Sequence, residues 1–86
     1  MSIHHNPSQH TFTDGQAELA YELPAPGVID FVHTQVPTGE QGQGVGSALA
    51  KAGLDYARQH AMRVVATCPF VASYIQQHAE YADLVK

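Results

Sequence analysis

The feature that most constrains this chain is a glycine-rich turn followed at once by a run of strong helix formers. The turn reads Gln41-Gly42-Gln43-Gly44-Val45-Gly46, and residues 47–51 continue it as Ser-Ala-Leu-Ala-Lys. Glycines at alternate positions leave the backbone bare, and the first turn of a helix has N–H groups without partners inside the helix. The helix dipole adds partial positive charge at the same point. Such a turn predicts a cradle for a diphosphate.

The segment before the turn narrows the choice of phosphate motif. Residues 27–37 are rich in β-branched and aromatic side chains and end at Pro37, which predicts a strand. A Walker motif is excluded because no lysine follows Gly46, and the glycine spacing differs from the dinucleotide-binding fingerprint. The pattern that fits is Gln/Arg-x-x-Gly-x-Gly/Ala, which Gln41, Gly44 and Gly46 satisfy.

This pattern resembles motif A of the GCN5-related N-acetyltransferases (GNAT), in which the turn amides hold the pyrophosphate of acetyl-coenzyme A. The resemblance continues through residues 33–37, 54–58, 67–71 and 78–81, and covers about residues 10 to 82. It is to the small single-domain members that carry a Thr-Cys-Pro-Phe segment. It implies a minimal α+β fold, with a mostly antiparallel sheet, a splayed parallel strand pair and two main helices.

The same resemblance implies where acetyl-coenzyme A binds. The turn would hold the pyrophosphate, and the end of the preceding strand would pair with the pantetheine amides. The cofactor-binding residues expected on this basis are Thr34, Gln35, Val36, Gln41, Gly42, Gln43, Gly44, Val45, Gly46, Ser47 and Phe70. Gln41 stands where many relatives carry arginine, so backbone amides and the helix dipole would hold most of the phosphate charge.

Cys68 is the first candidate catalytic residue. It lies between a predicted strand end and Pro69, which suits the first turn of a helix. A helix N-terminus stabilises a thiolate, so Cys68 is a candidate reactive thiol. The alternative is a small buried hydrophobic side chain, the ordinary role of a lone cysteine.

Tyr74 is the second candidate catalytic residue. In the wider family a tyrosine on this helix protonates the departing thiolate of coenzyme A, and Tyr74 falls near that place. The alternative is a core aromatic side chain four residues after Phe70. The asparagine that often begins this helix in the family is replaced here by Thr67 and Cys68.

Other polar residues are weaker candidates for a catalytic or metal-binding role. His33 has a pKa suited to a general base, but it is expected on the same strand face as Ile29 and Phe31, which favours a structural role. Glu40 would cap the turn or orient a substrate. The six histidines match no zinc spacing, so no metal site is expected.

Composition limits the class of protein. The 86 residues predict one domain over 1–86, with residues 1–8 frayed. Four Lys and Arg residues and a net charge of −4 argue against nucleic acid as a partner. A single cysteine allows no intramolecular disulfide, and there is neither a membrane-spanning apolar run nor a signal pattern. We therefore expect a cytoplasmic protein that does not contact membranes; its oligomeric state stays open.

The chain order of elements follows from periodicity and turn signals. Strands are predicted at residues 10–13, 16–23, 27–37 and 63–67, with the last one central in the sheet. Helices are predicted at about residues 44–60 and from Pro69 onward. In the second strand, Ala17, Leu19, Tyr21 and Leu23 are expected on one buried face.

The function that the resemblance implies is transfer of an acetyl group from acetyl-coenzyme A to an amine of unknown identity. The alternative is a non-catalytic module that binds acyl-coenzyme A or acts through protein contacts. Full-length relatives continue with further strands that wall the acceptor site. The acceptor pocket is therefore expected to be shallow or completed by a partner.

Overall fold

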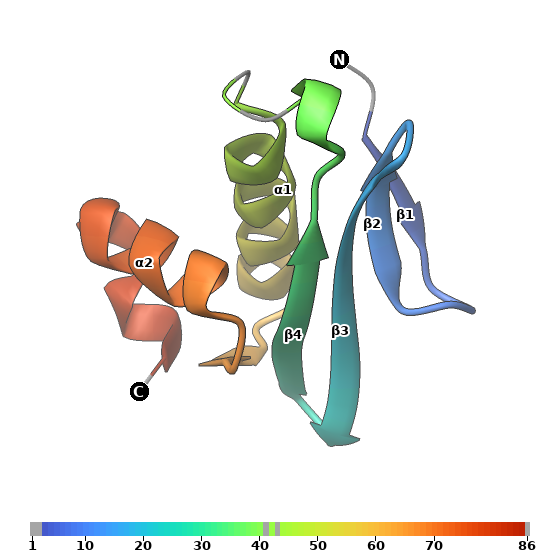
Figure 1. Cartoon of the computed structure of the whole chain (residues 1–86). Helices are drawn as coiled ribbons and strands as arrows, with labels where there is room; N and C mark the ends of the chain where they lie inside the picture. Colours follow the sequence, from blue (N-terminus) through green and yellow to red (C-terminus); the bar gives the residue numbers. More distant parts are fainter. Residues whose placement is uncertain (1–2, 41, 43, 86) are drawn as a thin grey trace.

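The computed structural model describes residues 3–40, 42 and 44–85, which form one sheet with helices packed against it (Figure 1). Its elements are β1 (His4–Asn6), β2 (Thr11–Asp14), β3 (Ala17–Ala25), β4 (Val28–Gln35), η1 (Thr38–Glu40), α1 (Val45–Gln59), β5 (Arg63–Ala66), α2 (Pro69–Gln77) and η2 (Ala79–Val85). The strands lie in sequence order, and β4 and β5 are parallel while the other pairs are antiparallel. The α+β fold expected from the resemblance is confirmed.

Residues His4–Asn6 form strand β1, so the prediction of a frayed N-terminal segment 1–8 is wrong for these residues. His4 pairs with Thr13 and His5 with Phe12 in an antiparallel ladder. The His5 ring stacks on Phe12 at 4.3 Å between centroids, and its Nε2 lies 2.6 Å from the Tyr21 hydroxyl. No apolar alternation marks this strand in the sequence, because an imidazole, rather than an aliphatic side chain, supplies the packing surface.

The next two strands differ from their predicted limits for local reasons. β2 begins at Thr11 because His10 has a φ of 57°, which belongs to the turn before it. In β3, Ala17, Leu19 and Tyr21 are buried as expected. Leu23 is 47% exposed, so its predicted burial is wrong. The pairing with β4 is irregular between Glu22 and Ala25, which breaks the alternation at that end of the strand.

Helix α1 has the predicted place and packs very closely on the sheet. It starts after Gly44 and ends at Gln59, within a residue of the expected limits. A Cβ added to Gly53 would lie 2.7 Å from Cε1 of Phe31, so only glycine allows this approach. The close contact fixes the helix N-terminus relative to β4.

Strand β5 lies at the edge of the sheet and not at its centre as predicted. In the described part of the chain it pairs with β4 alone. Ile29 and its neighbour Val64 are buried toward the helices, whereas Val65 on the opposite face is 40% exposed. The short apolar composition of β5 therefore reflects one buried face, with the other face of the sheet left open.

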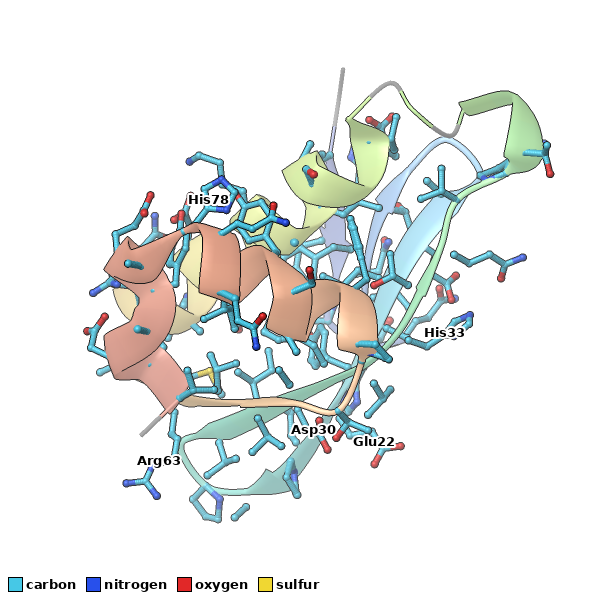
Figure 2. The ribbon with its side chains drawn as sticks, turned by 60° about the vertical axis from the view of Figure 1, so that its left-hand side comes forward. Glu22, Asp30, His33, Arg63 and His78 are labelled. Atoms are coloured by element: carbon cyan, nitrogen blue, oxygen red, sulfur yellow. The ribbon has the colours of Figure 1, made fainter. Side chains whose placement is uncertain are left out.

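A bulge in β4 changes which side chains face the helices. Ala20 pairs with His33, but Tyr21 pairs with Phe31, so Val32 is an extra residue in the strand. Beyond it the alternation is reversed. His33 is exposed, and its expected place beside Ile29 and Phe31 is wrong (Figure 2).

Candidate functional site

A hollow of about 340 Å³ opens at the N-terminus of α1. Its lining residues come from the end of β4, the glycine-rich turn, the first turn of α1 and the start of α2. They are Val36, Gly42, Gly44, Val45, Gly46, Ser47 and Phe70. Each of them was predicted to bind the cofactor. The predicted residues Gln41 and Gln43 lie outside the described residues.

Two of the glycines give the turn its shape. Gly42 and Gly44 have φ angles of 84° and 80°, a left-handed conformation that favours glycine. Gly44 is the N-cap of α1, and its carbonyl accepts the first helical hydrogen bond from the Ala48 N–H at 2.9 Å. Since glycine has no side chain to cap the helix, the first-turn N–H groups face the hollow without a side-chain acceptor. An anion would satisfy them.

Gly46, the third glycine of the motif, has a packing role. A Cβ on Gly46 would lie 2.9 Å from Cζ of Phe70. Gly46 therefore lets the first turn of α2 pack against the first turn of α1, and the Phe70 ring becomes a wall of the hollow. Sequence reasoning placed both residues at the site but gave no sign of this contact.

The hollow adjoins the place where the parallel strands diverge. The last β4–β5 pair is Phe31 with Ala66, and the Cys68 N–H then donates to the Phe31 carbonyl at 2.8 Å. From there β5 turns into α2 while β4 continues to Gln35. The predicted pantetheine-binding residues Thr34 and Gln35 are thus in the part of β4 that lies past the divergence.

Cys68 and Thr34 lie together at the narrow end of this divergence. Cys68 is the N-cap of α2 and is only 4% exposed. Its Sγ lies 3.2 Å from the Thr34 hydroxyl, close enough for a hydrogen bond in which either atom could be the donor. The β4 bulge makes this contact possible, because it turns Thr34 toward the helices.

Tyr74 lines a second hollow of about 320 Å³, which shares Phe70 with the first. Its ring stacks on His78 at 3.9 Å, and burial raises the pKa of its hydroxyl. Ser47, Phe70, Ser73 and Gln77 complete the lining, and Cys68 is not among these described residues. The structure therefore does not bring the two predicted catalytic residues into one hollow.

Ser73 and Gln77 were missed by the sequence reasoning. With Phe70 and Tyr74 they occupy positions i, i+3, i+4 and i+7, which share one face of α2. That spacing was the available signal, but it equally fits an ordinary packed helix face.

Within residues 3–40, 42 and 44–85, no group of three or more His, Cys, Asp or Glu side chains is arranged to hold a metal ion. None of the helices in this described part of the chain combines the length and the apolar character needed to cross a membrane.

Comparison with known proteins gives the family. The model of the GCN5-related N-acetyl-transferase family matches residues 9–84. The solution structure of a GCN5-like protein from Staphylococcus aureus has a TM-score of 0.72 and 26% identity, covering 96% of this chain and 85% of that one. This chain belongs to the GCN5-related N-acetyltransferase family.

Among curated proteins the chain is similar to vertebrate proteins named NATD1. It is 27% identical over 84 residues to the Gallus gallus protein, covering 91% of this chain and 76% of that protein. It is 32% identical over 63 residues to the Mus musculus protein, covering 73% of this chain and 57% of that protein. This alignment thus spans little more than half of the mouse relative.

Proposed function

We propose that this protein binds acetyl-coenzyme A and transfers its acetyl group to an amine. The observation that carries the proposal is the hollow over the N-terminus of α1, whose lining includes Val36 just after β4 and Phe70 at the start of α2. Family membership supports the same activity, since the family is one of N-acetyltransferases.

The proposed binding mode follows the hollow from one end to the other. The pyrophosphate would accept hydrogen bonds from the first-turn N–H groups between Gly44 and Ser47. The pantetheine arm would run along β4 past Val36 toward Thr34. The thioester would then lie at the narrow end, near the Thr34–Cys68 contact.

We favour direct transfer over a covalent route through Cys68. The amine nitrogen attacks the thioester carbonyl and loses a proton, the carbon–sulfur bond breaks, and the coenzyme A thiolate leaves and takes up a proton. A nucleophilic thiol would have to reach the same carbonyl. Cys68 is 4% exposed and contacts Thr34, so it supports the wall of the site better than it serves as a nucleophile.

The non-catalytic alternative also has an observation in its favour. Tyr74, the candidate proton donor, lines the second hollow and not the one beside β4. Binding without turnover would fit a module that senses acyl-coenzyme A. Turnover assays with a panel of amines separate the two, because the module would bind the cofactor and produce no acetylated amine.

Ser47 offers a sharp test of binding. It is exposed in the first turn of α1 and lines the hollow. Ser47→Glu places a negative charge beside the proposed pyrophosphate, so calorimetry should show coenzyme A affinity reduced at least about tenfold. Glutamate in a first helical turn favours the helix, so the variant should stay folded.

Ser47→Gln is the matched control, with nearly the same size and no charge. It should bind coenzyme A within about threefold of the parent protein, a difference of less than 1 kcal/mol. Equal affinities of the Glu and Gln variants would place the cofactor elsewhere and remove the basis of the proposal.

Mass measurement tests the route of transfer. Incubation with acetyl-coenzyme A and no acceptor should leave the protein mass unchanged, because direct transfer forms no acetyl-cysteine. Cys68→Ala should keep binding and most of its turnover. A stable adduct on Cys68 that disappears when an amine is added would instead establish the covalent route.

A further inference from the structure

The second hollow adjoins the first and has its own chemistry. Ser47 and Phe70 line both, so a ligand can pass from one to the other without leaving the protein surface. The second hollow adds the ring of Tyr74, the hydroxyl of Ser73 and the amide of Gln77. Two aromatic rings with a few polar groups suit a flat heterocycle.

A cation lies beside this hollow. Lys51 lies four residues after Ser47 on α1, so both side chains project from the same side of the helix, about 6 Å apart along its axis. Its Nζ lies 2.8 Å from Oδ2 of Asp55, which raises the pKa of the lysine and keeps it charged. Lysine has three N–H donors, so this pair leaves donors for a ligand.

The charge of Lys51 also affects Tyr74, which lines the second hollow. Burial raises the pKa of the Tyr74 hydroxyl, and the charge of Lys51 opposes that rise. The two groups are therefore near enough to interact. Lys51 is thus close to Tyr74, while Ser47, in the first turn of α1, lines both hollows.

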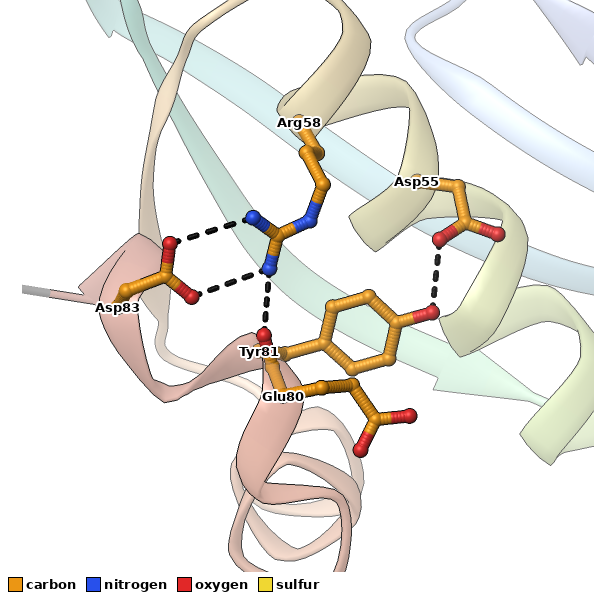
Figure 3. A network of polar contacts seen from close by, with 5 residues as sticks. All are labelled: Asp55, Arg58, Glu80, Tyr81 and Asp83. Atoms are coloured by element: carbon orange, nitrogen blue, oxygen red, sulfur yellow. Dashed lines mark hydrogen bonds and ion pairs between the residues drawn. The ribbon is translucent and has the colours of Figure 1, made fainter.

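The other described cations are engaged or distant. Arg58 donates to the Asp83 carboxylate and to the Glu80 carbonyl (Figure 3). Arg63 begins β5 and lies well away from His78 at the end of α2 (Figure 2). Of the residues the structure describes, Lys51 is thus the one Lys or Arg beside the two hollows.

We propose that the second hollow binds the 3′-phosphoadenosine end of coenzyme A and that Lys51 recognises its phosphate monoester. This inference rests on the proposed function. The pyrophosphate at the turn would direct the adenosine past Ser47, the adenine would pack against Phe70 and Tyr74, and the monoester would reach the ammonium group. Lys51 would then set the preference for coenzyme A over its 3′-dephospho form.

The assignment also concerns Tyr74. A tyrosine that contacts the nucleoside end cannot protonate the thiolate at the opposite end of the same cofactor. Tyr74→Leu removes the ring against which the adenine would pack, so it should raise KM and leave kcat within about threefold. A loss of kcat of about 10²–10⁴ would instead identify Tyr74 as the proton donor and contradict the placement of the adenosine.

Calorimetry with coenzyme A and 3′-dephospho-coenzyme A at one ionic strength tests the role of Lys51. The parent protein should bind coenzyme A about fivefold more tightly, which is typical of one partly exposed charge pair. Lys51→Gln should bind the two compounds equally, with its affinity for the dephospho compound unchanged. Arg63→Gln removes the same charge at a distant place and should keep the fivefold preference.

Three results would overturn the inference. Equal binding of both compounds to the parent protein would show that the monoester is not recognised. Equal losses of preference in Lys51→Gln and Arg63→Gln would show a general effect of net charge. Binding of neither compound would refute the proposed function, and this inference with it.

Discussion

At the scale of single residues, His5 shows how a polar side chain can complete a core. Its ring stacks on Phe12, meets Tyr56 edge-on at 4.5 Å, and bonds to the Tyr21 hydroxyl. Burial lowers the pKa of His5, and the nearby imidazoles of His60 and His10 lower it further. The docking of β1 therefore depends on a neutral imidazole.

This dependence predicts acid sensitivity. Because the folded protein holds His5 below its ordinary pKa of 6.5, the unfolded chain takes up the proton first as the pH falls. The stabilisation is complete above that value and is lost as the pH falls toward the lower folded-state pKa. Denaturant unfolding should therefore show a lower stability of the parent protein at about pH 5 than at pH 7.

Two variants test whether His5 causes this loss of stability at low pH. His5→Gln should be less stable than the parent protein at pH 7, but it should lose less stability than the parent protein on acidification. His4→Gln changes an exposed histidine of the same strand and should behave as the parent protein. If His5→Gln lost as much stability on acidification as the parent protein, another group would be responsible.

At the scale of elements, the distance between α1 and the sheet sets the geometry of the site. The helix can approach β4 because Gly53 faces the fully buried ring of Phe31. The same approach places the first turn of α1 beside the end of β4. A larger residue at this position would move the helix and the hollow together.

Gly53→Ala should therefore destabilise the protein although alanine is the better helix former. The gain in helix propensity is about 1 kcal/mol, whereas overpacking a core costs about 1–3 kcal/mol. We expect a net loss of about 1 kcal/mol in denaturant unfolding. Pairing the change with Phe31→Leu should recover part of the loss because the two residues touch.

Gly39→Ala is the control for this prediction. A Cβ there meets no atom within 4 Å, so stability should change by less than about 0.5 kcal/mol. If Gly53→Ala proved more stable than the parent protein, the helix would not be held against Phe31 as described.

At the scale of the whole molecule, a polar network ties the C-terminal η2 back to α1 (Figure 3). Tyr81 donates to Asp55 at 2.7 Å, and Arg58 holds Asp83 through two hydrogen bonds. Burial, with help from Asp55, raises the pKa of the Tyr81 hydroxyl, so it stays a donor at neutral pH. The hydrogen bond between Tyr81 and Asp55 joins residues that are 26 positions apart in the sequence.

Tyr81→Phe should lower the free energy of unfolding by about 1–2 kcal/mol, because a hydrogen bond to a charged acceptor is lost within a partly buried contact. Chemical denaturation checks this. Arg58→Gln should have a smaller effect, since both members of that ion pair are exposed. The opposite order would mean that the ion pair, and not the tyrosine, secures η2.

Much of the fold and part of the candidate site could be predicted because their signals are local. The α1 limits follow from Gly44 and the helix formers after it, and α2 begins at Pro69 as expected. The hollow contains the predicted turn residues because a glycine turn before a helix has one consistent geometry. Where an irregular strand pairing interrupts the periodicity, as for Leu23 and His33, the prediction was wrong.

The sequence by itself determined the order of the elements from β2 to α2 and the family, and it is the source of the prediction that the turn binds an anion. The tertiary structure alone decided the β4 bulge, the docking of β1, the Gly46–Phe70 contact and the second hollow. The physical reason is that these features depend on which distant segments pair and how closely they approach. A bulge reverses every side chain beyond it, so strand register, which no local pattern specifies, placed Thr34 beside Cys68 and left His33 outside.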